Sequence, residues 1–150
     1  MPDGPIKLDE QLCFALYAAT NAVTRAYRPL LDAFGLTYPQ YLVLMVLWQH
    51  GDSTPGQVAR RLNLAPNAIT PLADRLEQAK LLTRQRGDAD RRVIRLALTE
   101  KGRDLEAAIV RVQANIACQT GLPPDELTAL RDRLIALVRR MEPEATAPMN

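Results

Sequence analysis

Residues 54–98 read TPGQVARRLNLAPNAITPLADRLEQAKLLTRQRGDADRRVIRLAL, and this stretch decides the fold. It opens with a capping box, because the hydroxyl of Thr54 can accept an amide proton from the first helical turn while Gln57 reaches back to the amide of Thr54. A short helix to about Leu62, a brief turn and a second helix over residues 66–79 follow. Two short helices joined by a tight turn predict a helix-turn-helix.

After residue 81 the helical period gives way to a strand pattern. Ile94, Leu96 and Leu98 recur at every second position, as the buried side of a half-exposed strand requires. Residues 82–86 can pair with this strand, and residues 87–91 (GDADR) supply the turn between them. The sequence therefore predicts an arginine-rich β-hairpin directly after the helix-turn-helix.

Two helices are expected before this segment. Apolar side chains at three- and four-residue spacing predict a long helix over residues 8–31, whose end Pro29 is expected to kink or interrupt. These side chains are Leu8, Leu12, Ala15, Leu16, Ala19 and Val23. A second capping box, residues 37–40, opens the next helix. Residues 41–48 (YLVLMVLW) are apolar nearly all round, so this helix should be deeply buried.

Two further helices are expected after the hairpin. Thr99 can cap a helix that runs to Thr120, and Gly121 ends it. A final helix is striped by Leu127, Leu130, Leu134, Leu137 and Met141. The tail, residues 142–150, is expected to fray. Long amphipathic terminal helices either pair across a dimer or pack onto the core of their own chain.

The predicted fold is mostly α-helical with one small β-hairpin. A single domain covers residues 1–150, because a chain of this length can bury one real core. A winged helix-turn-helix occupies about residues 37–102. Helices at about 8–33 and 103–141 are the candidates for dimerisation.

Charge is unevenly distributed along the chain. The net charge is only +2, yet residues 60–103 hold eleven basic and five acidic side chains, a net charge of +6. The rest of the chain carries −4, so the basic segment predicts a surface for a polyanion. A merely soluble, solvated face is the alternative.

Other classes of protein are disfavoured by composition. No apolar run is long enough to span a membrane, and the first seven residues lack the form of a signal peptide, so we expect a cytoplasmic protein without membrane contact. There is no CxxC motif and His50 is the only histidine, so we expect neither a metal nor a cofactor. Two cysteines in such a chain are not a structural disulfide by default.

A helix-turn-helix places its second helix in the major groove of DNA. Asn67 and Thr70 near the start of that helix can bond base edges or phosphates, and Arg75 can reach a phosphate or guanine. The tip of the hairpin can insert an arginine into a minor groove, with an aspartate orienting it. Turn formation is the competing role for the acids of the tip. The candidate DNA contacts are Asn67, Thr70, Arg75, Arg86, Asp90, Arg91 and Arg92.

Cys13 lies in an apolar run, residues 12–17 (LCFALY), with phenols at Tyr17, Tyr27 and Tyr38 farther along the chain. A cysteine in such surroundings has two interpretations. It is either a small core side chain or a thiol whose thiolate is stabilised for chemistry.

The order of elements and the segment DADRRVIRLALTEKG, residues 88–102, resemble the MarR family of winged-helix dimeric repressors. Residues 8–17, 27–31 and 36–44 resemble its OhrR branch, which senses organic hydroperoxides. The resemblance implies a homodimer that binds a palindromic operator in double-stranded DNA. Two departures stand out: Ala65-Pro66-Asn67 replaces a common Asp-Ser-Gly, and Lys80 replaces a common glycine.

The resemblance also implies roles for individual residues. Cys13 matches the peroxidatic cysteine, with its thiolate held by Tyr27 and by Tyr38 of the partner subunit, and with Tyr17 nearby. Cys118 matches the resolving cysteine of the two-cysteine type, which implies a disulfide between Cys13 and Cys118 of different subunits. The wing arginine matches Arg92, supported by Asp90.

Three functions compete. The first is a repressor that senses organic hydroperoxides and releases its operator on oxidation. The second is a MarR-type repressor that answers a small aromatic ligand while Cys13 is inert. The third is a thiol peroxidase, which we disfavour because no catalytic acid or nearby arginine accompanies Cys13 in sequence and the basic segment would have no role. We therefore expect a regulator and not an enzyme.

Overall fold

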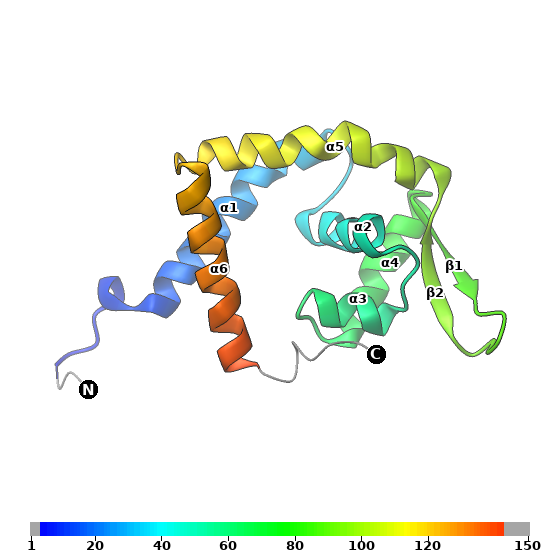
Figure 1. The fold of residues 1–150 in the computed structure, drawn as a ribbon, viewed down its shortest axis with the longest axis horizontal. Helices are drawn as coiled ribbons and strands as arrows, with labels where there is room; N and C mark the ends of the chain where they lie inside the picture. Colours follow the sequence, from blue (N-terminus) through cyan, green and yellow to red (C-terminus); the bar gives the residue numbers. More distant parts are fainter. Residues whose placement is uncertain (1–3, 143–150) are drawn as a thin grey trace.

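The structure, a computed structural model, describes residues 4–142. The tail that was expected to fray lies outside these residues, apart from Glu142. The helices are α1 (Leu12–Asp32), α2 (Tyr38–His50), α3 (Pro55–Arg61), α4 (Ile69–Gln78), α5 (Glu100–Gln119) and α6 (Pro124–Met141). Strands β1 (Leu82–Arg86) and β2 (Ile94–Leu98) form one hairpin (Figure 1). The prediction of a mostly helical chain with a small hairpin is confirmed.

Helix α1 differs from expectation at both ends. Residues 8–10 form a 3₁₀ turn and Gln11 is extended, so the regular helix begins at Leu12 and not at Leu8. At the other end the helix continues through Pro29 to Asp32. Proline removes only one backbone donor, and burial of Leu31 in the core holds the last turn.

Helix α2 is the centre of the core. Its capping box forms as predicted, with the Gln40 amide donating to the Thr37 hydroxyl and the Thr37 amide donating to the Gln40 side chain. Tyr41, Val43, Leu44, Val46 and Leu47 are all buried. Most of the apolar run is therefore buried, as its composition predicts, while Leu42, Met45 and Trp48 are partly exposed.

Helices α3 and α4 make the helix-turn-helix. The capping box of Thr54 and Gln57 is present at the start of α3. The predicted second helix is divided, because Pro66–Ala68 is a 3₁₀ turn and α4 begins only at Ile69. This places Pro71 in the first turn of α4, where its missing amide proton would have no helical partner.

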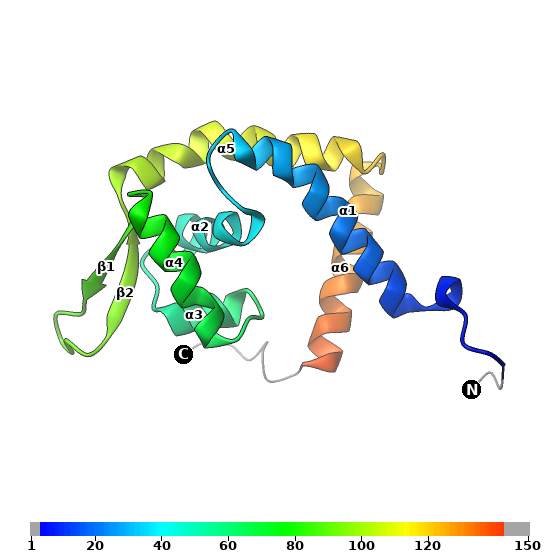
Figure 2. The same ribbon diagram turned by 180° about the vertical axis from the view of Figure 1, so that it is seen from behind.

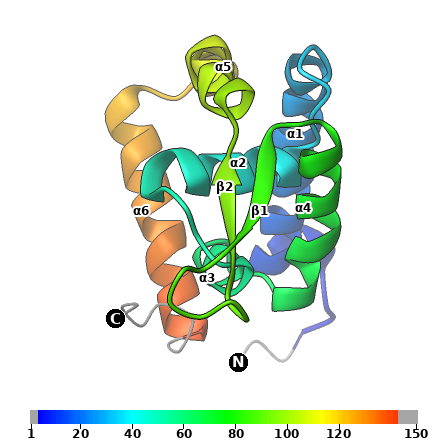
Figure 3. The same ribbon diagram turned by 90° about the vertical axis from the view of Figure 1, so that its right-hand side faces the viewer.

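The hairpin pairs as expected, with Leu82 opposite Leu98 and Arg86 opposite Ile94. Ser53 adds a short bridge to it, since its amide donates to the Leu96 carbonyl at 3.1 Å and the Leu96 amide donates back at 2.8 Å. In Figure 3, where the hairpin faces the viewer, β1 lies beside α4. The wing is thus fixed to the helix-turn-helix at its base.

Lys80 ends α4 in a left-handed conformation, with φ of 61°. The Leu81 amide donates to the Leu76 carbonyl at 3.0 Å, and the Lys80 amide donates to the Glu77 carbonyl at 2.9 Å. This is the Schellman motif, and Leu76 and Leu81 are buried as its usual apolar pair. Lys80 therefore forms the left-handed cap that glycine usually provides, although lysine carries a side chain.

Helix α5 starts in close contact with the end of α4. The Thr99 hydroxyl caps α5 by accepting from the Gly102 amide at 3.0 Å, and it donates to the Lys80 carbonyl at 2.6 Å. A Cβ atom on Gly102 would lie 2.1 Å from the Leu81 carbonyl oxygen. Trp48 of α2 donates its indole proton to the Gly102 carbonyl at 2.9 Å. Only glycine fits this position.

The two ends of the chain extend away from this body. Helix α5 runs along its top, α6 turns down from the far end of α5, and α1 descends nearby toward the N-terminus (Figures 1 and 2). None of the side chains of α6 is fully buried within the described chain. Leu12 of α1 is 61% exposed and Leu130 of α6 is 47% exposed. These helices carry apolar faces that their own chain does not cover.

We expect Gly102→Ala to lower the free energy of unfolding by about 3 kcal/mol, because a backbone carbonyl must move to admit the methyl group. Urea denaturation followed by circular dichroism measures this change. Gly56→Ala is the matched control, since its added Cβ meets nothing closer than the Thr54 hydroxyl at 4.0 Å. Equal stability of Gly102→Ala and wild type would contradict the proposed tight contact.

Candidate functional site

Helix α4 has one buried face and one exposed face. Ile69, Ala73 and Leu76 are buried against the core. Thr70 and Arg75 are exposed on the helix, and Asn67 is exposed on the 3₁₀ turn that precedes it. Asn67, Thr70 and Arg75, three of the predicted DNA contacts, are therefore not covered by other parts of the described chain.

The tip of the wing is held in shape by its own side chains. Asp90 accepts a hydrogen bond from the Arg92 amide at 3.0 Å, and its carboxylate lies 3.5 Å from Nε of Arg92. Arg86 donates to the Arg91 carbonyl at 2.9 Å. The Arg92 side chain is 95% exposed. Asp90 therefore accepts across the turn from the Arg92 amide, as its competing turn-forming role requires, and its carboxylate also lies beside the exposed Arg92 guanidinium, while Arg86 supports the backbone next to it.

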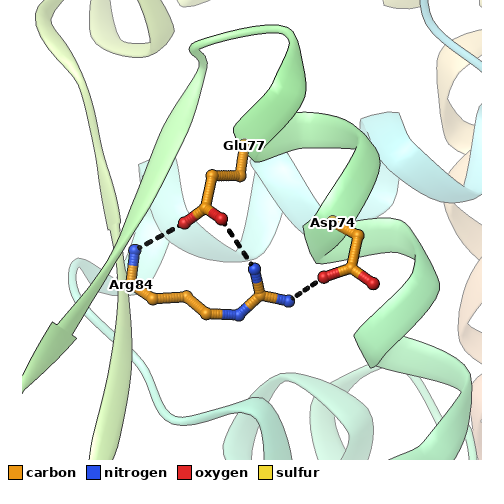
Figure 4. Close-up of polar contacts among 3 residues, drawn as sticks. All are labelled: Asp74, Glu77 and Arg84. Atoms are coloured by element: carbon orange, nitrogen blue, oxygen red, sulfur yellow. Dashed lines mark hydrogen bonds and ion pairs between the residues drawn. The ribbon is translucent and has the colours of Figure 1, made fainter.

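Arg84 connects the wing to α4, and sequence reasoning missed it (Figure 4). Its guanidinium pairs with Asp74 and, at 3.0 Å, with Glu77, while its backbone amide donates to Glu77 at 3.2 Å. A signal was present, since the two acids lie three residues apart on one helix face and Arg84 shares a strand face with buried Leu82. Arg84 thus offsets one of the two negative charges that Asp74 and Glu77 place on a helix expected to face phosphates.

Tyrosines from α1 and α2 form a second cluster. The rings of Tyr27 and Tyr38 have centroids 4.7 Å apart. Tyr41, which sequence reasoning did not select, lies 5.8 Å from Tyr27 and 6.4 Å from Tyr38. The structure therefore brings together two of the three predicted tyrosines in a single chain.

Burial makes these phenols harder to ionise than exposed tyrosines. Loss of solvent around Tyr27, reinforced by Tyr38 and Tyr41, raises its pKa to about 12. Burial also raises the pKa of Tyr38 and of Tyr41. A neutral phenol remains a hydrogen-bond donor at physiological pH, so this cluster offers donors to an anion.

The cysteines lie apart from this cluster within one chain. Cys13 and Cys118 are both exposed, reduced thiols, and Tyr17 is exposed beside Cys13 on α1. Cys13 and Tyr27 lie on the same continuous helix, whose rise over that separation is about 21 Å. Cys13 therefore cannot contact Tyr27 of its own chain. Because the rings of Tyr27 and Tyr38 pack against each other in one chain, a thiolate that reaches one of them lies close to the other.

An apolar groove of about 840 Å³ opens beside the tyrosines. Helices α1, α5 and α6 contribute most of its walls, among them Val23, Tyr27, Ile116, Leu130 and Leu134, and Tyr38 of α2 completes the lining. In residues 4–142 no group of three or more His, Cys, Asp or Glu side chains is placed to hold a metal ion. The described helices also include none with the length and apolarity to cross a membrane.

We expect Arg84→Met to weaken binding to a labelled mixed-sequence DNA duplex roughly tenfold, because each uncompensated carboxylate facing a phosphate costs on the order of 1 kcal/mol. Fluorescence anisotropy measures the affinity. Adding Asp74→Asn and Glu77→Gln to this variant should restore most of the loss. Failure of that rescue would assign Arg84 a different role.

Tyr27 should make stability fall at alkaline pH. Between pH 10 and about 12 the folded chain keeps a phenol proton that the unfolded chain has released, so stability present below pH 10 is lost through that window. The loss is on the order of 1 kcal/mol after solvent screening. Denaturation at pH 9 and pH 11 should show a smaller drop for Tyr27→Phe than for wild type. An identical drop would contradict the shift.

Known proteins have sequences similar to that of this chain. Residues 36–94 match the MarR family. The chain is 43% identical over 135 residues to the HTH-type transcriptional regulator TtmR of Methylorubrum extorquens, covering 90% of this chain and 69% of that protein. It is 37% identical over 136 residues to the organic hydroperoxide resistance transcriptional regulator of Bacillus subtilis, covering 91% and 92%.

Solved structures share the fold. Reduced AbfR of Staphylococcus epidermidis, bound to DNA, has a TM-score of 0.73 and 34% identity, covering 89% of this chain and 94% of that one. AbfR is also known in overoxidized and disulfide forms. CouR of Rhodococcus jostii RHA1, bound to p-coumaroyl-CoA, has a TM-score of 0.77 and 27% identity, covering 97% and 99%. From its winged helix-turn-helix and these relatives, the chain belongs to the MarR family of DNA-binding transcriptional regulators.

Proposed function

We propose that this regulator is a repressor that senses organic hydroperoxides through Cys13 and releases its operator when Cys13 forms a disulfide with Cys118 of the partner subunit. The observation that carries the proposal is the pair of protonated phenols, Tyr27 and Tyr38, beside an apolar groove. Such a pair can stabilise a thiolate, and an apolar groove favours an alkyl peroxide over hydrogen peroxide.

A homodimer would complete this site. The 3₁₀ turn at residues 8–10, the first half of α1 and most of α6 expose apolar side chains that a second copy can cover, including Leu8, Leu12, Leu130 and Leu134. Because Cys13 lies about 21 Å along α1 from its own Tyr27, a Tyr27 phenol that reaches it must come from the other subunit. We therefore place Cys13 against the partner's Tyr27 and the partner's Tyr38, so that both donors come from one chain.

The proposed chemistry has two steps. The Cys13 thiolate attacks one oxygen of the peroxide, an S–O bond forms, the O–O bond breaks, and the leaving alkoxide takes a proton from water. The product is a sulfenic acid and an alcohol. The Cys118 thiol of the partner then attacks that sulfur, forming the S–S bond, while the hydroxyl leaves with the thiol proton as water.

Oxidation would release DNA by moving the subunits. A disulfide requires Cα atoms within about 7 Å. If the reduced thiols are farther apart, α1 and α5 of the two subunits must shift, and each α5 is joined rigidly to a wing through Gly102. A dimer can dock both recognition helices only at a spacing of about 34 Å, so such a shift weakens binding. The regulator of Bacillus subtilis named for organic hydroperoxide resistance supports this assignment.

The test is oxidation of the purified protein with stoichiometric cumene hydroperoxide, followed by a non-reducing gel and by anisotropy on an operator selected from a random duplex library. We expect a covalent dimer and loss of DNA affinity in wild type. Cys13→Ser and Cys118→Ser should each bind DNA when reduced and form no covalent dimer. A monomer band in oxidised wild type would contradict the disulfide.

A second candidate is a repressor that answers a small aromatic ligand. The groove of about 840 Å³ beside Tyr27 favours it, because that volume suits a drug-sized molecule. CouR, with its bound p-coumaroyl-CoA, is a structural neighbour of this kind. Cys13→Ser separates the two functions, since an aromatic acid would still displace the operator from this variant whereas a peroxide would not.

A further inference from the structure

The end of α4, the recognition helix, is bonded to the segment that begins α5. The Lys101 ammonium donates to the Ala79 carbonyl at 3.0 Å. The Thr99 hydroxyl and the Thr99 amide donate to the carbonyls of Lys80 and Leu81, at 2.6 Å and 3.0 Å. Carbonyls at the C-terminal end of a helix have no acceptor role left within the helix, so donors from outside must satisfy them. We call these three bonds the α4–α5 clamp.

Lys101 makes the one bond of the clamp that comes from a charged side chain. The two bonds of Thr99 also serve other ends, because its amide continues the pairing of the hairpin and its hydroxyl caps α5. Within residues 4–142 the ammonium of Lys101 has no other hydrogen bond and pairs with no carboxylate. A cation is favoured at this place, since the C-terminal end of a helix carries the negative end of its dipole.

The clamp lies at the opposite end of α5 from α6 (Figures 1 and 2). A second copy that covers the apolar face of α6 therefore leaves the three bonds in place. In such a homodimer each α4 is attached to its own α5, and both recognition helices must sit about 34 Å apart to enter successive major grooves. The direction in which α4 leaves α5 thus contributes to that spacing.

We propose that Lys101 is a positioning residue for DNA binding, which fixes the direction of α4 relative to α5 and thereby the spacing of the two recognition helices. Its ammonium acts on the Ala79 carbonyl and not on a DNA phosphate. The role rests on the homodimer of the proposed function and is independent of the chemistry of Cys13. Without this bond α4 takes more orientations in the free protein, and ordering them on DNA lowers the affinity.

The test compares two duplexes by anisotropy, using the full-length reduced protein. One is the selected operator, and the other has one base pair inserted between its half-sites. We expect Lys101→Met to weaken binding to the operator roughly fivefold, the ratio that a cation at a helix C-terminus can supply. The loss on the lengthened duplex should be smaller, so the preference for the operator falls. Lys101→Arg should restore that preference, because a guanidinium can donate to the same carbonyl.

Lys80→Met is the matched control. Lys80 carries the same charge at the same junction but enters the clamp only through its backbone carbonyl. This variant should bind both duplexes as wild type does. The dependence of affinity on salt separates the proposed role from a phosphate contact, whose loss would reduce the slope of log affinity against log salt concentration by about 0.9. We expect an unchanged slope in Lys101→Met.

Several results would overturn the proposal. A reduced salt slope in Lys101→Met would assign the ammonium to a phosphate, and wild-type affinity would leave it without a role in binding. Equal weakening on both duplexes, or loss of the helical circular dichroism at the assay temperature, would make Lys101 a residue of general stability. A monomer on DNA in sedimentation would remove the spacing role, whereas the response to peroxide is measured separately by the non-reducing gel.

Discussion

The contact on which this structure depends is the approach of the first turn of α5 to the carbonyl of Leu81. Gly102 permits it sterically, and Thr99 secures it from both sides by capping α5 and bonding the end of α4. Trp48 ties the same point to α2. The base of the wing, the end of the recognition helix and the start of the long α5 therefore meet at one junction. Any movement of α5 is passed to the DNA-binding elements.

Ion pairs of Arg84, in the middle of β1, reinforce the attachment of the wing to α4. Arg84 spans from the wing to Asp74 and Glu77, so α4 and the hairpin behave as one body. The terminal helices differ from this body, since α6 buries no side chain fully within the described chain. The molecule thus divides into a winged helix-turn-helix and terminal helices that their own chain covers only in part.

Local chemistry explains how much the sequence could predict. Capping boxes, apolar period and turn residues lie close together in the chain, so the helix-turn-helix, the hairpin and the Asp90–Arg92 contact were all predictable. The division of the predicted second helix into a 3₁₀ turn and α4, which begins at Ile69, was not predictable. Proline is compatible with the first turn of a 3₁₀ helix as well as with that of an α-helix. Arg84 was missed because its partners come from another element. The grouping of Tyr27 with Tyr38 in one chain likewise depends on tertiary packing, which no spacing rule encodes.

Because α1 and α6 carry uncovered apolar faces, their stability depends on the concentration of the protein. Apolar surface of α1 and α6 that is buried only against a second copy contributes to stability only after the two copies associate. By mass action, the folded form of these helices therefore becomes more populated as the protein concentration rises. An isolated chain would present these faces to other proteins and to proteases. For a regulator made in few copies per cell, the supply of partner chains would then set how long each chain survives as well as how tightly it holds DNA.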